Sequence, residues 1–174
     1  MAKSINFKNE VYWDSSSVVH NKKKLSDILD VEYCQLTVYG TKVCPSNTDT
    51  TITSFYVPTS YGGFEADTTN GRLVIPVGTK TIETSGMICG CGYATVRLKI
   101  VDTNGSQLSN YQQTGVLVQT YGNGYWKHAL PNLIIELDET KSYYIYLVVS
   151  GYNQAFTINA GFGSSSFIQA KKIR

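Results

Sequence analysis

The fold is decided by the stretch Thr95-Val96-Arg97-Leu98-Lys99-Ile100, in which apolar and polar residues alternate without a break. Successive side chains along a β-strand point to opposite faces of a sheet. The three apolar residues therefore face a core, while Arg97 and Lys99 meet water. Asn104-Gly105 follows, a pair that tolerates the positive φ angles of a tight turn. We expect a half-buried antiparallel strand that ends in a hairpin turn.

Short strand-like runs and turn signals continue on both sides of this strand. A second turn pair, Asn70-Gly71, precedes it, and residues 45–54 have the composition of a loop. The other predicted strands are residues 33–38, 52–57, 72–76, 80–91, 116–118, 133–137, 143–150, 155–159 and 166–172. No helix of ordinary length is expected after residue 30. Regularly spaced short strands separated by turns predict an all-β sandwich or barrel.

The composition fits one β-rich domain. The chain has 174 residues, which is enough for a single hydrophobic core. Charged residues make up 16% of it, against about 25% in typical globular domains, while tyrosine is abundant. A net charge of +2 is too close to neutral to indicate nucleic-acid binding, so no nucleic-acid partner is expected.

Neither a membrane span nor an export signal is apparent. Residues 143–149 form the longest clearly apolar stretch, far short of the ~20 residues that cross a bilayer. Residues 1–8 contain no apolar core of signal-peptide length. We therefore expect a protein that is made in the cytoplasm without a cleaved signal and has no membrane partner.

The cysteines predict neither disulfides nor a metal site. They are Cys34, Cys44, Cys89 and Cys91. A reducing compartment favours free thiols, and a bridge between Cys89 and Cys91 would be strained. Zinc needs about four ligands, and the only histidines, His20 and His128, lie far away in the sequence. Small buried apolar residues are the favoured interpretation, with zinc as the alternative, so we expect no cofactor.

Residues 1–30 differ from the rest of the chain. Leu25, Ile28 and Leu29 have the spacing of one apolar helical turn, which is too short to be stable alone in water. This segment must therefore pack on its own domain, on sister chains or on a docking partner. We expect an N-terminal attachment or trimerisation segment at 1–30 and a head domain at 31–174.

The predicted strand 143–149 is apolar or aromatic on both faces. One set of side chains fills the core, whereas Tyr144, Tyr146 and Val148 form a second set that needs its own cover. Contiguous exposed apolar patches mark interfaces, so we interpret these three residues as a subunit interface. The alternative is a central strand with a loop over its outer face.

Several stretches together indicate a family. They are residues 72–82, with Pro76 and Gly78 between two strands, the hairpin 96–105, the strand pair 134–137 and 143–147, and the final strand 166–168. In pattern and order they resemble the jelly rolls of the tumour-necrosis-factor and complement-head family, over about residues 55–173. Lys80 departs from the apolar residues usual in that family. The resemblance implies a jelly-roll β-sandwich and a homotrimer, which agrees with the two-faced strand.

The N-terminal segment suggests where such a trimer would work. Residues 5–14 and 18–29 are similar to the openings of tail and head appendage proteins of bacteriophages and prophages. That resemblance implies a virion protein made in the host bacterial cytoplasm. Its N-terminal segment would bind other virion structural proteins, and its head would face outward.

No catalytic apparatus is recognisable. The sequence has no Gly-x-Ser-x-Gly elbow and no phosphate-binding loop. Gly161-Phe162-Gly163 lacks the third glycine of a dinucleotide fingerprint. Tyr125 and His128 have no orienting acid nearby, and Glu136 with Asp138 more simply flank a turn. We expect a protein that is not an enzyme.

Residues 121–128 form the segment best suited to recognition. It is predicted to be a loop that combines two glycines with aromatic and hydrogen-bonding side chains, namely Tyr121, Asn123, Tyr125, Trp126 and His128. Aromatic rings offer flat apolar faces to sugars or proteins, and the polar groups bond hydroxyls. The alternative is that these rings pack the end of the sandwich.

Three functions remain open from the sequence. The favoured one is a trimeric phage appendage whose head binds a host-surface glycan or protein. The second is a purely structural virion decoration or connector without a receptor. The third, a cytokine-like ligand, is disfavoured because no export signal is apparent.

Overall fold

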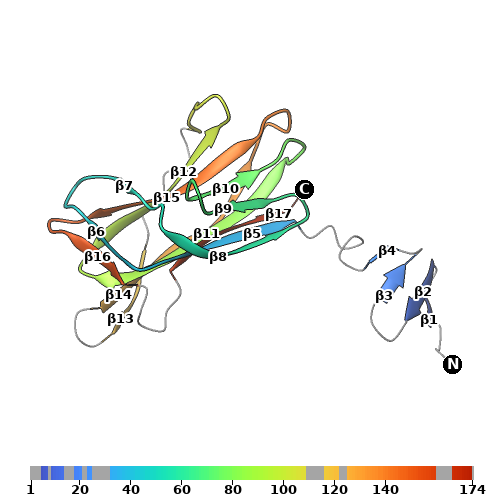
Figure 1. Cartoon of the computed structure of the whole chain (residues 1–174), viewed down its shortest axis with the longest axis horizontal. Helices are drawn as coiled ribbons and strands as arrows, with labels where there is room; N and C mark the ends of the chain where they lie inside the picture. The colour runs from blue at the N-terminus through green and yellow to red at the C-terminus, as the bar shows by residue number, and fades with distance from the viewer. Residues whose placement is uncertain are drawn as a thin grey trace.

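The computed structural model describes residues 5–7, 9–13, 18–20, 23–24, 32–108, 116–121, 125–159 and 166–173. Within these ranges every regular element is a strand, and three sheets are present. Figure 1 shows β10, β12 and β15 together on one side of the head and β5, β11 and β17 together on the other. The predicted all-β class is confirmed.

The smaller layer of the head is a five-stranded antiparallel sheet. Its strand order is β12-β15-β10-β9, and β7 pairs with the end of β15. The bounds are β7 Thr50–Thr51, β9 Glu65–Asp67, β10 Arg72–Ile75, β12 Ala94–Asp102 and β15 Tyr143–Gly151. The pairing of β12 with β15 extends along the whole length of both strands, and these two strands form the main part of this sheet.

The larger layer is an eight-stranded sheet with the main order β13-β14-β11-β17-β5-β8. Strand β16 joins it by pairing with the last residues of β11, and β6 pairs with β16. The bounds are β5 Tyr33–Val38, β6 Thr41–Cys44, β8 Phe55–Tyr61, β11 Thr81–Cys91, β13 Val116–Tyr121, β14 Tyr125–Glu136, β16 Phe156–Asn159 and β17 Phe167–Lys172.

One hydrophobic core lies between the two sheets. In β12 the apolar Val96, Leu98 and Ile100 are buried, as their alternation with charged residues predicts. Leu36 of β5 and Ile82 of β11 meet them from the opposite sheet as members of the same buried cluster. The alternating strands thus bury one face each, which is the arrangement of a β-sandwich.

The predicted strands agree with the structure in most places, and β8 is the instructive exception. The sequence predicts a strand that stops before Pro58, yet β8 continues through it to Tyr61. This strand is the last in the order of its sheet. An edge strand has one side free of ladder hydrogen bonds, so a residue without an N–H is tolerated there.

The N-terminal segment holds a separate four-stranded sheet. It consists of β1 Ile5–Phe7, β2 Asn9–Trp13, β3 Val18–His20 and β4 Lys23–Lys24, which pair in chain order. Among the strands that the structure describes, these four pair only with one another. The predicted apolar turn at residues 25–29 lies outside the described residues. The division at residue 30 stays a prediction.

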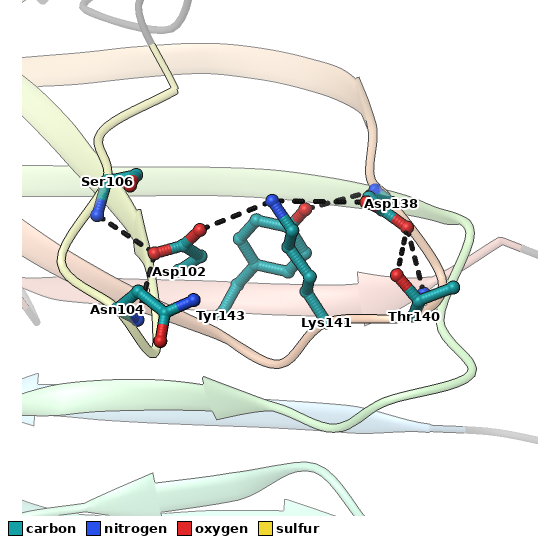
Figure 2. A network of polar contacts seen from close by, with 7 residues as sticks. All are labelled: Asp102, Asn104, Ser106, Asp138, Thr140, Lys141 and Tyr143. Atoms are coloured by element: carbon teal, nitrogen blue, oxygen red, sulfur yellow. Dashed lines mark hydrogen bonds and ion pairs between the residues drawn. The ribbon is translucent and has the colours of Figure 1, made fainter.

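A polar network closes one end of the five-stranded sheet, where β12 ends and β15 begins (Figure 2). The carboxylate of Asp102 accepts the backbone N–H groups of Asn104 and Ser106 at 2.9 and 2.8 Å. Lys141 lies 3.4 Å from the same carboxylate. The Ser106 N–H and Lys141 therefore hold the pKa of Asp102 below its ordinary value. This network fixes the hairpin that Asn104-Gly105 predicts, with Gly105 at a φ of 83°.

Candidate receptor-binding site

Two strand connections and the start of β14 lie together at the opposite end of the sandwich. Strand β11 ends at Cys91, and Gly92 and Tyr93 turn the chain into β12. The first residue of β12 pairs with Gly151, after which residues 152–155 lead into β16. Tyr125, which begins β14, pairs with Cys91, so the start of β14 lies at the same end. We call this region the tyrosine end.

Glycines allow the backbones at the tyrosine end to approach closely. A Cβ atom at Gly151 would lie 2.0 Å from the carbonyl oxygen of Gln154. One at Gly90 would lie 2.2 Å from the carbonyl oxygen of Thr157. No side chain fits at such distances without moving the backbone, so only glycine permits this packing.

Tyr93 and Tyr152 line a shallow pocket at this end. The backbone N–H of Tyr152 donates to the carbonyl of Tyr93 at 2.9 Å, which holds the two turns together. Their side chains stay 47% and 57% exposed. Asn153 and Gln154 complete the lining of a pocket of about 280 Å³. Aromatic and amide side chains thus line a shallow surface pocket.

The predicted recognition segment at residues 121–128 is mostly strand rather than loop. Tyr121 is the last residue of β13, and Tyr125 and Trp126 are the first residues of β14. Tyr121 pairs with Tyr125, and Trp126 lies opposite Gly90 in the register. The side chains of these three residues, and Asn123 as a whole, lie outside what the structure describes.

His128 belongs to the core of the tyrosine end. Its side chain is 2% exposed and packs edge-on against Phe156, with ring centroids 5.4 Å apart. Its Nε2 lies 3.4 Å from the carbonyl oxygen of Gly92, to which it donates. Burial lowers the pKa of His128, and the carbonyl only partly offsets that effect. The ring is therefore not available to a ligand at the surface. For His128 this agrees with the alternative that the rings of residues 121–128 pack the end of the sandwich.

The predicted interface residues on β15 have cover within the single chain. The guanidinium of Arg72 lies 3.8 Å above the ring of Tyr144. Its Nη1 is 3.4 Å from the hydroxyl of Tyr146. Val148 is only 6% exposed and lies opposite Arg97, which forms an ion pair with Asp49 at 2.7 Å. Lack of cover therefore no longer argues for a subunit contact here. A contact at these residues stays a prediction.

We call the outer surface of the five-stranded sheet around Tyr144, Tyr146 and Val148 the closed face. The outer surface of the eight-stranded sheet differs from it. Directly paired residues of an antiparallel sheet share a face. One row runs through Tyr61, Tyr33, Lys171, Glu83 and Ile134, and a second through Tyr56, Thr37, Phe167, Met87 and Ala129. We call these two rows the open face. Tyr56, Tyr61 and Ile134 are 50%, 60% and 67% exposed.

Three of the four cysteines are buried, as the sequence predicts, and Cys91 is half-buried. All four are free thiols, and Cys34, Cys44 and Cys89 are buried. Burial raises the pKa of Cys34 to about 12 and that of Cys44 to about 11, so both stay protonated near neutral pH. Across the described residues no cluster of three or more His, Cys, Asp or Glu side chains is arranged to hold a metal ion. Nor does that part of the chain contain a helix long and apolar enough to cross a membrane.

The sequence did not identify Tyr93 and Tyr152 as site residues. A signal exists in retrospect: each tyrosine follows a glycine directly at the end of a long predicted strand, as Gly92-Tyr93 and Gly151-Tyr152. An aromatic residue in a tight connection has little core to pack against. Only the register of β12 with β15 shows that the two tyrosines meet.

Comparison with known proteins establishes the fold class. The head is a tumour-necrosis-factor-like jelly roll. The crystal structure of murine APRIL at pH 8.0 superimposes with a TM-score of 0.50 at 10% identity, covering 82% of this chain and 99% of that chain. Eiger TNF from S. frugiperda gives a TM-score of 0.48 at 10% identity, over 83% and 93% of the two chains.

Sequence comparison adds no family. No protein-family model matches the chain. No curated protein matches it either. The predicted jelly roll is thus confirmed by the structure and its likeness to murine APRIL.

Proposed function

We propose that this chain is a non-enzymatic appendage protein of a bacteriophage virion, which acts as a homotrimer and presents its jelly roll to a receptor on the host surface. The observation that carries the proposal is the tyrosine end. Exposed Tyr93 and Tyr152 lie there beside a pocket, and Tyr125 at the start of β14 lies at the same end. Binding residues on connections between rigid strands are a common design for recognition.

The N-terminal segment supports a role in attachment. Its sequence is similar to the openings of phage appendage proteins, and its four short strands pair only among themselves within the described part of the chain. A small sheet of this kind buries little apolar surface on its own. Contact with other virion proteins would supply the missing packing.

The open face supports the trimer. Tyr56, Tyr61 and Ile134 would bury large apolar surface on association, whereas the closed face is already occupied by its own charged side chains. Tyr56 and Tyr61 both lie on the edge strand β8 and Ile134 lies on β14, and exposed large apolar residues are candidates for an interaction surface. We therefore place the subunit contacts on the eight-stranded sheet.

Electron microscopy of phage particles tests the location. Virions of the phage that encodes the chain are labelled with an antibody against residues 31–174. Label at the tail tip or on projecting fibres is expected. Particles that carry no label would contradict the proposal.

Competition tests the receptor role. Purified full-length protein, added to host cells before the phage, is expected to reduce adsorption of the phage in proportion to its concentration. Labelled virions whose adsorption is unaffected by excess protein would instead indicate a structural decoration without a receptor.

A further inference from the structure

We propose that the pocket between Tyr93 and Tyr152 binds the ring of an uncharged sugar, with the two tyrosines as stacking platforms and Asn153 and Gln154 as hydroxyl partners. The proposal deepens the receptor role above and rests on it, because it names the chemical class that the tyrosine end would take. Three observations support it: the size of the pocket, the uncharged residues that line it and the hydrogen bonds that hold its backbone.

The backbone that carries the two rings is held in place from several sides. Besides the bond from Tyr152 to Tyr93, the N–H of Gly151 donates to the carbonyl of Pro45, and the carbonyl of Gly151 accepts the N–H of Asn47, both at 2.9 Å. Asn153 has a φ of 60°, a left-handed conformation that asparagine tolerates better than most residues. Two fixed turns present the tyrosines, so little conformational entropy is lost on binding.

The pocket lining matches a sugar in chemistry. The C–H faces of a pyranose are apolar and pack on aromatic rings, and its hydroxyl groups bond amides, which both donate and accept. Tyr93 and Tyr152 supply the rings, and the exposed side chains of Asn153 and Gln154 supply amide groups. The volume of about 280 Å³ is near the lower limit of small-molecule sites, which fits one ring better than a long oligomer.

The charge of the lining selects against ionised sugars. None of the four residues that line this pocket is charged. A second pocket, of about 130 Å³, is lined by Asp49, Arg97 and Lys99 among others and lies on the five-stranded sheet. An acidic sugar would find a cationic partner there and none among the four residues that line the pocket between Tyr93 and Tyr152. We therefore expect the pocket between Tyr93 and Tyr152 to favour neutral sugars and the second pocket to favour charged ones.

The experiment is a titration of the full-length protein, labelled at its tyrosine rings for nuclear magnetic resonance. The probes are the methyl glycosides of glucose, galactose, mannose and N-acetylglucosamine, with methyl glucuronide as the charged comparison. At least one neutral glycoside is expected to shift the ring signals of Tyr93 and Tyr152 but not those of Tyr61. Glucuronide is expected to leave the same signals unchanged.

Two variants separate stacking from folding. Tyr152→Ala removes one platform from an exposed position and is expected to weaken binding at least about tenfold. Tyr152→Phe keeps the ring and is expected to stay within about threefold of wild type. The proposal is overturned if no neutral glycoside shifts Tyr93 and Tyr152. It is also overturned if glucuronide binds as well as the neutral probes, or if Tyr152→Ala binds unchanged.

Failure of this sugar site can be distinguished from failure of the proposed receptor role. If neutral glycosides bind the pocket but the protein does not compete with phage adsorption, the sugar site stands and the receptor role fails. If the protein competes but no neutral glycoside binds, the receptor role stands and this site assignment fails.

Discussion

The outer faces of the two sheets differ in how their apolar side chains are covered. On the five-stranded sheet, Arg72 lies over Tyr144, and the ion pair of Arg97 with Asp49 lies beside Val148. On the eight-stranded sheet, Tyr61 and Ile134 stay exposed at the two ends of one row. Long charged side chains can cover apolar surface, so a face covered in this way needs no partner subunit to bury it. An apolar strand alone therefore does not identify an interface, because the residues beside it decide whether its outer side chains are covered.

A pair of charge substitutions would break this comparison most strongly. Ile134→Lys places a charge on the open face opposite Glu83, where the isolated subunit tolerates it. In a desolvated contact the same charge is costly, so we expect the trimer to weaken at least about a hundredfold. Tyr146→Glu places a charge on the closed face between Lys99 and Arg72, and we expect it to keep the trimer.

Light scattering coupled to size-exclusion chromatography measures both variants. Circular dichroism of each variant provides the folding control. Dissociation by Tyr146→Glu with no effect of Ile134→Lys would reverse the assignment of the two faces and restore β15 as the interface.

The next largest effect is expected from Arg72, which holds the closed face together. Arg72→Ala removes the stacking on Tyr144 and the 2.9 Å ion pair with Asp67. We expect the free energy of unfolding to fall by about 1–2 kcal/mol in urea titrations. Arg72→Lys keeps the charge but not the planar ring contact, so about half of the loss should remain. An unchanged urea midpoint for Arg72→Ala would show that the closed face does not depend on this side chain.

The smallest effect concerns His128 and pH. Because burial lowers its pKa below the ordinary 6.5, the folded state binds the proton less readily than the unfolded state. The stability that the neutral ring contributes is complete above about 6.5 and is lost as the pH falls through the range between the two pKa values. Urea titrations at several pH values should show this decline in the wild type and a flatter profile in His128→Leu. Identical slopes for both proteins would contradict the burial of a neutral ring.

Periodicity predicted the sandwich because each strand follows its own local pattern. Strand β5 occupies the predicted residues 33–38, and β12 contains the predicted residues 95–100 and extends beyond them at both ends. Strand β14 begins eight residues before its predicted start at Leu133, since Pro131 and polar residues interrupt the pattern there. Its pairing with both β11 and β13 outweighs weak local propensity.

The candidate site was harder to predict because it depends on contacts between distant segments. His128 sits in a run rich in polar and aromatic residues, yet the register with Ile88 turns it into the core. Tyr93 and Tyr152 are 59 positions apart by their numbers and meet only because Ala94 pairs with Gly151. A single sequence carries no direct signal for such pairings.

The central claim is that the jelly roll acts as a homotrimer, and the mass of the unmodified chain tests it most directly. Sedimentation equilibrium of the full-length protein measures that mass without assuming a shape. The account predicts a species of three times the 19.2 kDa chain mass. A single species at 19.2 kDa over the whole accessible concentration range would contradict it.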